Sequence, residues 1–183
     1  MRVVAGDLKG RKIEAVKGDN TRPTSDKIKE TIFNVMGQFF DGGVALDLFA
    51  GSGNLGIEAL SRGIDTAIFI DADFQAVKTI KQNIKTLGLE KQTEVYRNDA
   101  FKALKVLAAK ETTFDLVFLD PPYGKIALTE LLNELLGLNL LTEGALIVCE
   151  YGIGEEVAYD SSQLEEIKQA TYGSIGIHVL KKR

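Results

Sequence analysis

From residue 44 to residue 150, short apolar runs alternate with segments of helical periodicity, and this alternation constrains the fold more than any other feature. Strands are expected at 44–49, 66–70, 93–97, 114–119 and 145–150, with helices between them. Strands separated by helices pair in parallel through right-handed crossovers. The sequence therefore predicts an α/β fold with a doubly wound, mostly parallel sheet.

The C-terminal tail departs from this pattern. Strand-like runs at 166–172 and 175–181 are separated only by Gly173 and Ser174, too short a link for a crossover helix. We expect these runs to form an antiparallel hairpin at the sheet edge, which brings the sheet to seven strands.

The first 40 residues are expected to extend the fold. Segments 2–5 and 10–15 predict a short β-hairpin, and a helix is expected to start near Thr24 or Ser25. Four apolar residues would line one face of that helix: Ile28, Ile32, Val35 and Phe39. At 183 residues the chain has the size of one domain. We expect a single domain over 1–183, with an N-terminal extension at 1–40 and a core at 44–183.

Composition excludes several classes of site. With one cysteine, Cys149, no internal disulfide can form. With one histidine, His178, no His/Cys cluster can hold a metal, and Ser-His-Asp chemistry is disfavoured. Cys149 lies in an apolar run and is expected to be an inert core thiol, and His178 to have a structural or surface role. No apolar run is long enough to span a bilayer, and no signal peptide is evident, so a cytoplasmic location is expected.

The charge is unevenly distributed along the chain. Residues 1–31 carry eight basic and five acidic side chains, a net charge of +3, whereas the remainder carries 14 basic and 21 acidic side chains, a net charge of −7. The formal total is −4. A basic arm on an acidic body is compatible with nucleic-acid binding, and equally with ordinary solvated charges.

The strand-turn-helix junction at 47–56 is the strongest local motif. Its glycines Gly51, Gly53 and Gly56 follow the G-x-G-x-x-G spacing, which lets the backbone approach a ligand at a helix N-terminus. Asp71 closes the next strand twenty residues after Gly51, where a carboxylate would bind ribose hydroxyls. Alone, these features fit a dinucleotide as well as S-adenosylmethionine.

Two acidic residues favour the methyl donor. The charge of Asp47 suits the cationic amino and sulfonium groups of S-adenosylmethionine and would oppose a pyrophosphate. Asp99, after the third strand, could accept a hydrogen bond from the adenine amino group. In isolation, however, an aspartate at that position is more often a helix cap.

Asp120-Pro121-Pro122-Tyr123 directly follows the fourth strand, at the edge where α/β sheets bind ligands. An aromatic exocyclic amine is a poor nucleophile, because its lone pair is delocalised into the ring. The Asp120 carboxylate and the Pro121 carbonyl can accept its hydrogen bonds and turn that lone pair towards a methyl group. Tyr123 offers a stacking face for an extruded base.

This tetrapeptide resembles the (Asn/Asp/Ser)-Pro-Pro-(Tyr/Phe) motif of amino-methyltransferases that act on adenine N6 or guanine N2. The pattern Gly6, Gly10-Arg11, Arg22-Pro23-Thr24-Ser25-Asp26 and Lys29-Glu30-Thr31-Ile32-Phe33-Asn34, with Asp47 to Gly53, is similar to the RsmD family over essentially the whole chain. The resemblance implies a Rossmann-like class I methyltransferase fold. It also implies methylation of a guanine N2 in 16S rRNA, within a small ribosomal subunit or an assembly intermediate, with S-adenosylhomocysteine as product.

The resemblance also implies roles for individual residues. The guanine would be held by Asp120, Pro121 and Tyr123. The cofactor would be bound by Thr24, Asp47, Phe49, Gly51, Ser52, Gly53, Asn54, Asp71, Asp99 and Ala100. RNA would be bound by Arg2, Arg11, Lys12 and Arg22. The resemblance implies no metal.

Four other functions are weighed against this interpretation. Adenine N6 presents its NH2 group to the same motif and is the nearest alternative. An NAD-dependent oxidoreductase would not explain the Asp120-Pro121-Pro122-Tyr123 motif. A non-catalytic RNA-binding module would not explain the cofactor motif at 47–56. C5 methylation of a pyrimidine is disfavoured, since no cysteine nucleophile lies in a loop.

Overall fold

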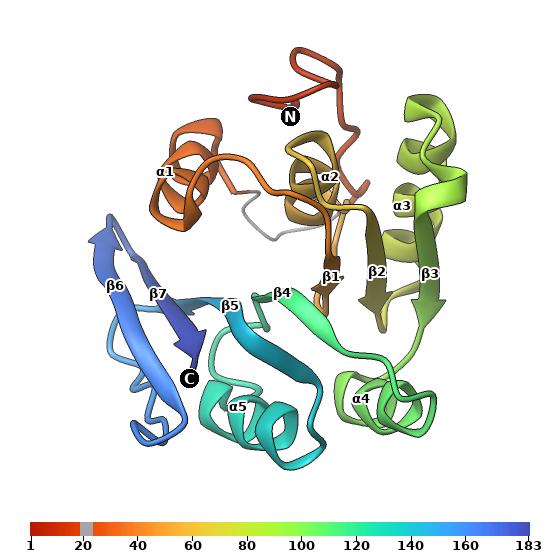
Figure 1. Cartoon of the computed structure of the whole chain (residues 1–183). Coiled ribbons are helices and arrows are strands. Elements are labelled where there is room, and N and C mark those ends of the chain that lie inside the picture. The colour runs from red at the N-terminus through yellow and green to blue at the C-terminus, as the bar shows by residue number, and fades with distance from the viewer. Residues whose placement is uncertain (19–23) are drawn as a thin grey trace.

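A computed structural model of the 183-residue chain describes residues 1–18 and 24–183, and its centre is a seven-stranded sheet (Figure 1). The strands are β1 (Val44–Asp47), β2 (Thr66–Asp71), β3 (Thr93–Arg97), β4 (Phe114–Leu119), β5 (Leu141–Gly152), β6 (Leu164–Tyr172) and β7 (Ile175–Lys182). Their order is β3-β2-β1-β4-β5-β7-β6. The first five pair in parallel, whereas β7 runs antiparallel to both β5 and β6. The predicted doubly wound sheet and its C-terminal edge hairpin are confirmed.

Helices cover both faces of this sheet. Figure 1 shows α1 (Asp26–Met36), α2 (Asn54–Ser61) and α3 (Phe74–Leu87) on one face, and α4 (Ala100–Ala109) and α5 (Leu128–Gly137) on the other. A short 3-10 helix, η1 (Glu90–Gln92), precedes β3. Side chains of Ser25, Asp73 and Asp99 cap the N-termini of α1, α3 and α4 by accepting backbone N–H bonds.

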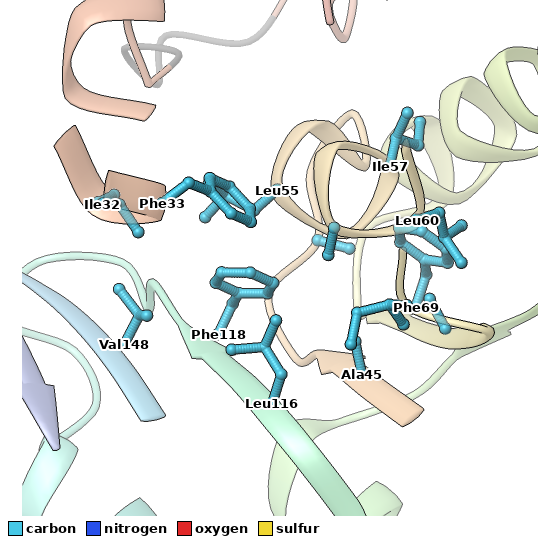
Figure 2. Close-up of a cluster of buried hydrophobic side chains, with 14 of the residues drawn as sticks. Ile32, Phe33, Ala45, Leu55, Ile57, Leu60, Phe69, Leu116, Phe118 and Val148 are labelled. Atoms are coloured by element: carbon cyan, nitrogen blue, oxygen red, sulfur yellow. The ribbon is translucent and has the colours of Figure 1, made fainter. Parts of the chain in front are cut away.

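The hydrophobic core is divided by the sheet into two clusters, because alternate residues of each strand point to opposite faces. On the side of α1 and α2, the Phe33 and Phe118 rings lie 5.9 Å apart between centroids, beside Val148 (Figure 2). Leu55 and Ile57 of α2 belong to the same cluster, and α4 and α5 cover the other.

The N-terminal segment packs on the outer side of α2 and α3 (Figure 1). Val3 and Ile13 are fully buried in the first core cluster. The expected hairpin is reduced to one antiparallel bridge between Arg2 and Lys12, supported by backbone bonds such as Val3 N–H to the Arg11 carbonyl (2.9 Å). Backbone pairing is present there, but it does not extend into regular strands.

Several expected boundaries were wrong. The first strand ends at Asp47 rather than at 49, because the chain turns there towards α2, and the fifth begins at Leu141 rather than 145. The first helix ends at Met36, where Gly37 adopts a φ of 108°. Phe39 therefore lies beyond the helix and is 58% exposed, so its expected place on the apolar face was wrong.

Within the described part of the chain, none of the helices has the length and apolar character needed to cross a membrane.

Candidate active site

The glycine turn between β1 and α2 lies at the carboxyl edge of the parallel strands. Gly51 and Gly53 have φ angles of 56° and 84°, a left-handed conformation that glycine adopts without strain. The turn is closed by a bond from the Gly53 N–H to the Ala50 carbonyl (2.7 Å). Ala50 N–H in turn donates to the Ile70 carbonyl of β2 (3.0 Å). The N-terminus of α2 thus begins immediately beside the strand ends.

Asp47 is the last residue of β1, and its side chain is buried beneath this turn. Its Oδ2 atom accepts a hydrogen bond from the Gly56 N–H (3.0 Å). Burial raises the pKa of Asp47 to about 7, and the nearby charge of Asp71 contributes in the same direction. Because ionised Asp47 has no cationic partner among the described residues, a positively charged ligand would stabilise it.

Asp71 is the last residue of β2, as expected, and its carboxylate accepts hydrogen bonds from two backbone N–H groups. Oδ2 accepts the Gly51 N–H (2.9 Å), and Oδ1 accepts the Asp73 N–H (2.9 Å). These bonds connect the glycine turn to the loop before α3. The expected ribose contact of Asp71 stays a prediction.

Asp99 is the N-cap of α4, which confirms the alternative that the sequence left open. Its Oδ1 accepts the Lys102 N–H (3.1 Å), and Asp99 itself is exposed while Ala100 is buried. The exposed Asp99 carboxylate lies two residues after the end of β3. Its bond to an adenine amino group stays a prediction.

Asp120 follows β4 directly, and strand register places it in the site. Asp47 pairs with Phe118 across the β1–β4 ladder, so Asp120 projects just beyond the end of β1. Burial raises the pKa of Asp120 well above its ordinary value, and the charges of Glu150 and Asp47 raise it further. The structure therefore brings Asp120 and Asp47 together beside the glycine turn.

Glu150 is a site residue that the sequence interpretation missed. It is 3% exposed, and it accepts hydrogen bonds from the Thr24 Oγ1 (3.4 Å) and the Tyr123 hydroxyl (3.5 Å). Burial raises its pKa. A signal was available, because an acidic residue also ends or follows the apolar runs of β1, β2 and β4, at Asp47, Asp71 and Asp120.

Pro121 is buried and Tyr123 is 51% exposed, so the ring is accessible beside the Asp120 carboxyl group. The ring lies against Gly152, where a Cβ atom would come 3.6 Å from the Tyr123 Cγ. Burial and the charges of Glu150 and Asp120 raise the pKa of Tyr123 to about 12. The tyrosine therefore stays protonated and presents a neutral face.

Thr24 joins this site to the turn through buried polar bonds. Its backbone carbonyl accepts from the Asn54 Nδ2 (3.4 Å), and the Asn54 Oδ1 accepts from the Lys29 Nζ (2.7 Å). Lys29 is fully buried and also pairs with Glu58 (3.1 Å). Lys29 is one of the eight basic residues of the N-terminal arm, but it adds no surface charge there, because its ammonium group is enclosed.

Ser52 and Phe49 complete the expected cofactor residues. The Ser52 carbonyl accepts from the Asn83 Nδ2 of α3 (2.9 Å), which holds the turn from its other side. Phe49 is half-buried and packs against the second core cluster. Their contacts with a cofactor stay predictions.

Of the expected RNA-binding residues, Arg2 and Lys12 are partners in the backbone bridge of the N-terminal segment, and Arg11 precedes Lys12; their contacts with RNA stay predictions. Exposed Arg2 pairs with Asp26 (3.1 Å) near the start of α1, and Lys12 with Glu14 (2.9 Å). Arg11 donates to the Thr86 carbonyl (3.0 Å) in the last turn of α3. Arg22 and Pro23 lie outside the described residues.

Cys149 and His178 lie in the core of the sheet. Cys149 is fully buried, which confirms its expected place in the core, and burial raises its pKa to about 12. His178 of β7 is 3% exposed, and its Nε2 lies 2.8 Å from the Glu166 Oε2, a structural role. No group of three or more potential metal ligands occurs within 1–18 and 24–183.

Comparison with known proteins places this site in a family. The family model described as Conserved hypothetical protein 95 matches residues 1–181. The chain belongs to this family. Within it, the chain is 50% identical to the putative rRNA methyltransferase YlbH of Bacillus subtilis, over the full length of both proteins. It is 36% identical to the ribosomal RNA small subunit methyltransferase D of Haemophilus influenzae, over 82% of this chain and 78% of that protein.

Solved structures agree with the family at the level of the fold. The putative methyltransferase yhhF of Escherichia coli is 31% identical, with a TM-score of 0.85 over 100% of this chain and 98% of its own. SMU.776, a putative methyltransferase solved in complex with SAH, is 13% identical, with a TM-score of 0.69 over 84% of this chain and 49% of its own. The second likeness concerns the fold alone. The chain has the class I methyltransferase fold, as the sequence resemblance implied.

Proposed function

We propose that this protein transfers a methyl group from S-adenosylmethionine to the exocyclic N2 of a guanine in 16S rRNA. The observation that carries the proposal is the position of Asp120. Its carboxyl group lies at the carboxyl edge of the sheet, beside Asp47 and the glycine turn, with the accessible ring of Tyr123 next to it. The names of the family relatives support rRNA as the substrate class.

The residues of the site fit a cationic cofactor. Asp47, Asp120 and Glu150 are acidic groups without a basic partner in residues 1–18 and 24–183. They would stabilise a sulfonium and an ammonium group, whereas a dinucleotide pyrophosphate would be repelled. S-adenosylmethionine, when bound, supplies an electrophilic methyl group on positively charged sulfur. Gly51, Gly53 and Asp47 would hold its methionine part.

The chain's own residues would prepare the nucleophile. The Asp120 carboxylate and the Pro121 carbonyl accept hydrogen bonds from the guanine NH2 group, which localises the nitrogen lone pair. Tyr123 stacks on the extruded base, an interaction worth about 1–3 kcal/mol. As the nitrogen gains the methyl group it gives up one proton, which the Asp120 carboxylate accepts.

The substrate class is tested with labelled S-adenosylmethionine and small ribosomal subunits from cells that lack the protein. Label is expected in N2-methylguanosine after digestion to nucleosides. Label in N6-methyladenosine would favour the adenine alternative. Label on ribose or on ribosomal protein would overturn the proposal.

The role of Asp120 is tested by substitution. Asp120→Ala is expected to lower the rate of transfer at least ~100-fold, since it removes a group that acts mainly in the transition state. Cofactor affinity, measured by calorimetry, should stay within about threefold of the parent value. Turnover equal to that of the parent protein would contradict the assignment.

A further inference from the structure

We propose that Glu150 is a positioning residue for methyl transfer, which holds the Asp120 carboxyl group and the Tyr123 ring in their working geometry. The inference rests on the function proposed above. It assigns a role to a buried acid that forms part of no recognised motif in the sequence.

Strand register places the two carboxyl groups side by side. β4 and β5 pair in parallel with Leu119 opposite Cys149, so Asp120 and Glu150 are the next residues on adjacent strands. Leu119 and Cys149 belong to the core cluster beneath α4 and α5. Because side chains alternate along a strand, the following pair points to the opposite face, towards α1 and α2.

Glu150 connects three segments that are distant in sequence. Its Oε1 accepts from the Tyr123 hydroxyl (3.5 Å), and its Oε2 accepts from the Thr24 Oγ1 (3.4 Å). The Thr24 carbonyl accepts from Asn54 of the glycine turn (3.4 Å). One buried carboxylate therefore links the segment before α1, the end of β5 and the loop after β4.

Glu150 also acts on Asp120 through its charge. Burial raises the pKa of Asp120, and the charge of Glu150 beside it raises that pKa further, which favours the protonated form of Asp120. Asp47 from β1 faces the pair as a further acid, while Tyr123 and Thr24 donate to Glu150. No basic side chain of the described residues pairs with either carboxyl group.

This arrangement has a consequence for pH dependence. Asp120 must be ionised to accept hydrogen bonds from the substrate amine, and the charge of Glu150 opposes that ionisation. Removing the charge lowers the pKa of Asp120, so the acid limb of the rate profile should move to lower pH. An amide at position 150 keeps the size of the side chain, and its single oxygen can still accept from either Tyr123 or Thr24.

The test compares Glu150→Gln and Glu150→Ala with Glu143→Gln, which replaces an exposed glutamate on the same strand, β5. For Glu150→Gln we expect kcat to fall ~10-fold near neutral pH, KM for the ribosomal subunit to change less than about threefold, and the acid limb to move to lower pH. Glu150→Ala should lower kcat ~100-fold, because both held groups are released. Glu143→Gln should match the parent.

A second readout does not require turnover. Calorimetry of S-adenosylmethionine binding in buffers of different ionisation enthalpy measures proton release, which should be smaller for Glu150→Gln than for the parent or Glu143→Gln. Unchanged proton release together with an unchanged acid limb would overturn the role of Glu150, even if Glu150→Ala failed to fold. If the parent protein bound the cofactor but did not methylate subunits, the proposed function would fail separately.

Discussion

Asp47 shows how a single residue can link ligand binding to stability. Burial raises its pKa to about 7, so its ionised form is disfavoured in the folded protein. Since the folded pKa lies above that of a free aspartate, the unfolded chain loses its proton first as pH rises. The contribution of Asp47 to stability therefore declines between about pH 4 and about pH 7, and it remains unfavourable above that window. A bound cation would reverse this effect.

Cofactor affinity should consequently depend on pH. We expect S-adenosylmethionine to bind more tightly at pH 8 than at pH 6, with proton release at pH 6, because the cation favours ionised Asp47. Asp47→Asn should weaken binding ~10-fold or more at pH 8 and reduce the difference between the two pH values. Isothermal calorimetry at both values measures this. An affinity of Asp47→Asn equal to that of the parent would show that no cation lies beside this side chain.

At the scale of elements, helix α2, which follows the glycine turn, packs closely on strand β2 of the sheet. A Cβ atom at Gly56 would overlap the Phe69 ring of β2, although Gly56 has an ordinary helical φ. This glycine is therefore required by contact with β2, whereas Gly51 and Gly53 adopt positive φ angles. The same contact sets the height of the α2 N-terminus above the strand ends.

Gly56→Ala is expected to destabilise the protein by about 1–3 kcal/mol, because the helix or the ring must shift to admit the methyl group. Gly137→Ala is the matched control, since Gly137 ends α5 and a Cβ there would meet nothing within 4 Å. It should be neutral or up to ~1 kcal/mol more stable, as alanine is the better helix former. Chemical denaturation of both variants provides the comparison. Equal effects would mean that the Phe69 contact does not limit the packing.

For the whole molecule, buried Lys29 connects the N-terminal extension to the catalytic core. Its ammonium group donates to the Arg2 carbonyl (2.7 Å) and to the Asn54 Oδ1 (2.7 Å), and it pairs with Glu58. Burial lowers its pKa, an effect that the charge of Glu58 partly offsets. Arg62 pairs with the same carboxylate (2.9 Å). The extension is therefore bonded directly to the glycine turn.

Lys29→Met should lower the free energy of unfolding by about 3 kcal/mol or more, because it leaves buried acceptors without a donor. It should also weaken cofactor binding, since Asn54 loses a bond that orients it. Lys27→Met, an exposed position on the same helix, should change stability by less than ~0.5 kcal/mol. Thermal melts with and without S-adenosylmethionine separate the two effects. Loss of stability with unchanged affinity would show that the network does not reach the turn.

Much of the fold was predictable from local patterns. Strands β3 and β4 were predicted with their observed bounds. Apolar periodicity and glycine caps are short-range signals, so they identify elements reliably. Phe39 was misplaced because its apolar spacing continued the helical pattern past Gly37, which ends the helix.

The sequence by itself determined the chemistry at the ends of the strands. Because strands and helices alternate, the four residues at the strand ends lie at one edge of a parallel sheet: Asp47, Asp71, Asp99 and Asp120. The glycine spacing lets a ligand approach the backbone at that edge. Tertiary structure alone decided the roles of Glu150 and Lys29, whose side chains are enclosed by segments far apart in the chain. Charge patterns along a sequence carry no information on desolvation, because burial depends on which distant residues pack around a group.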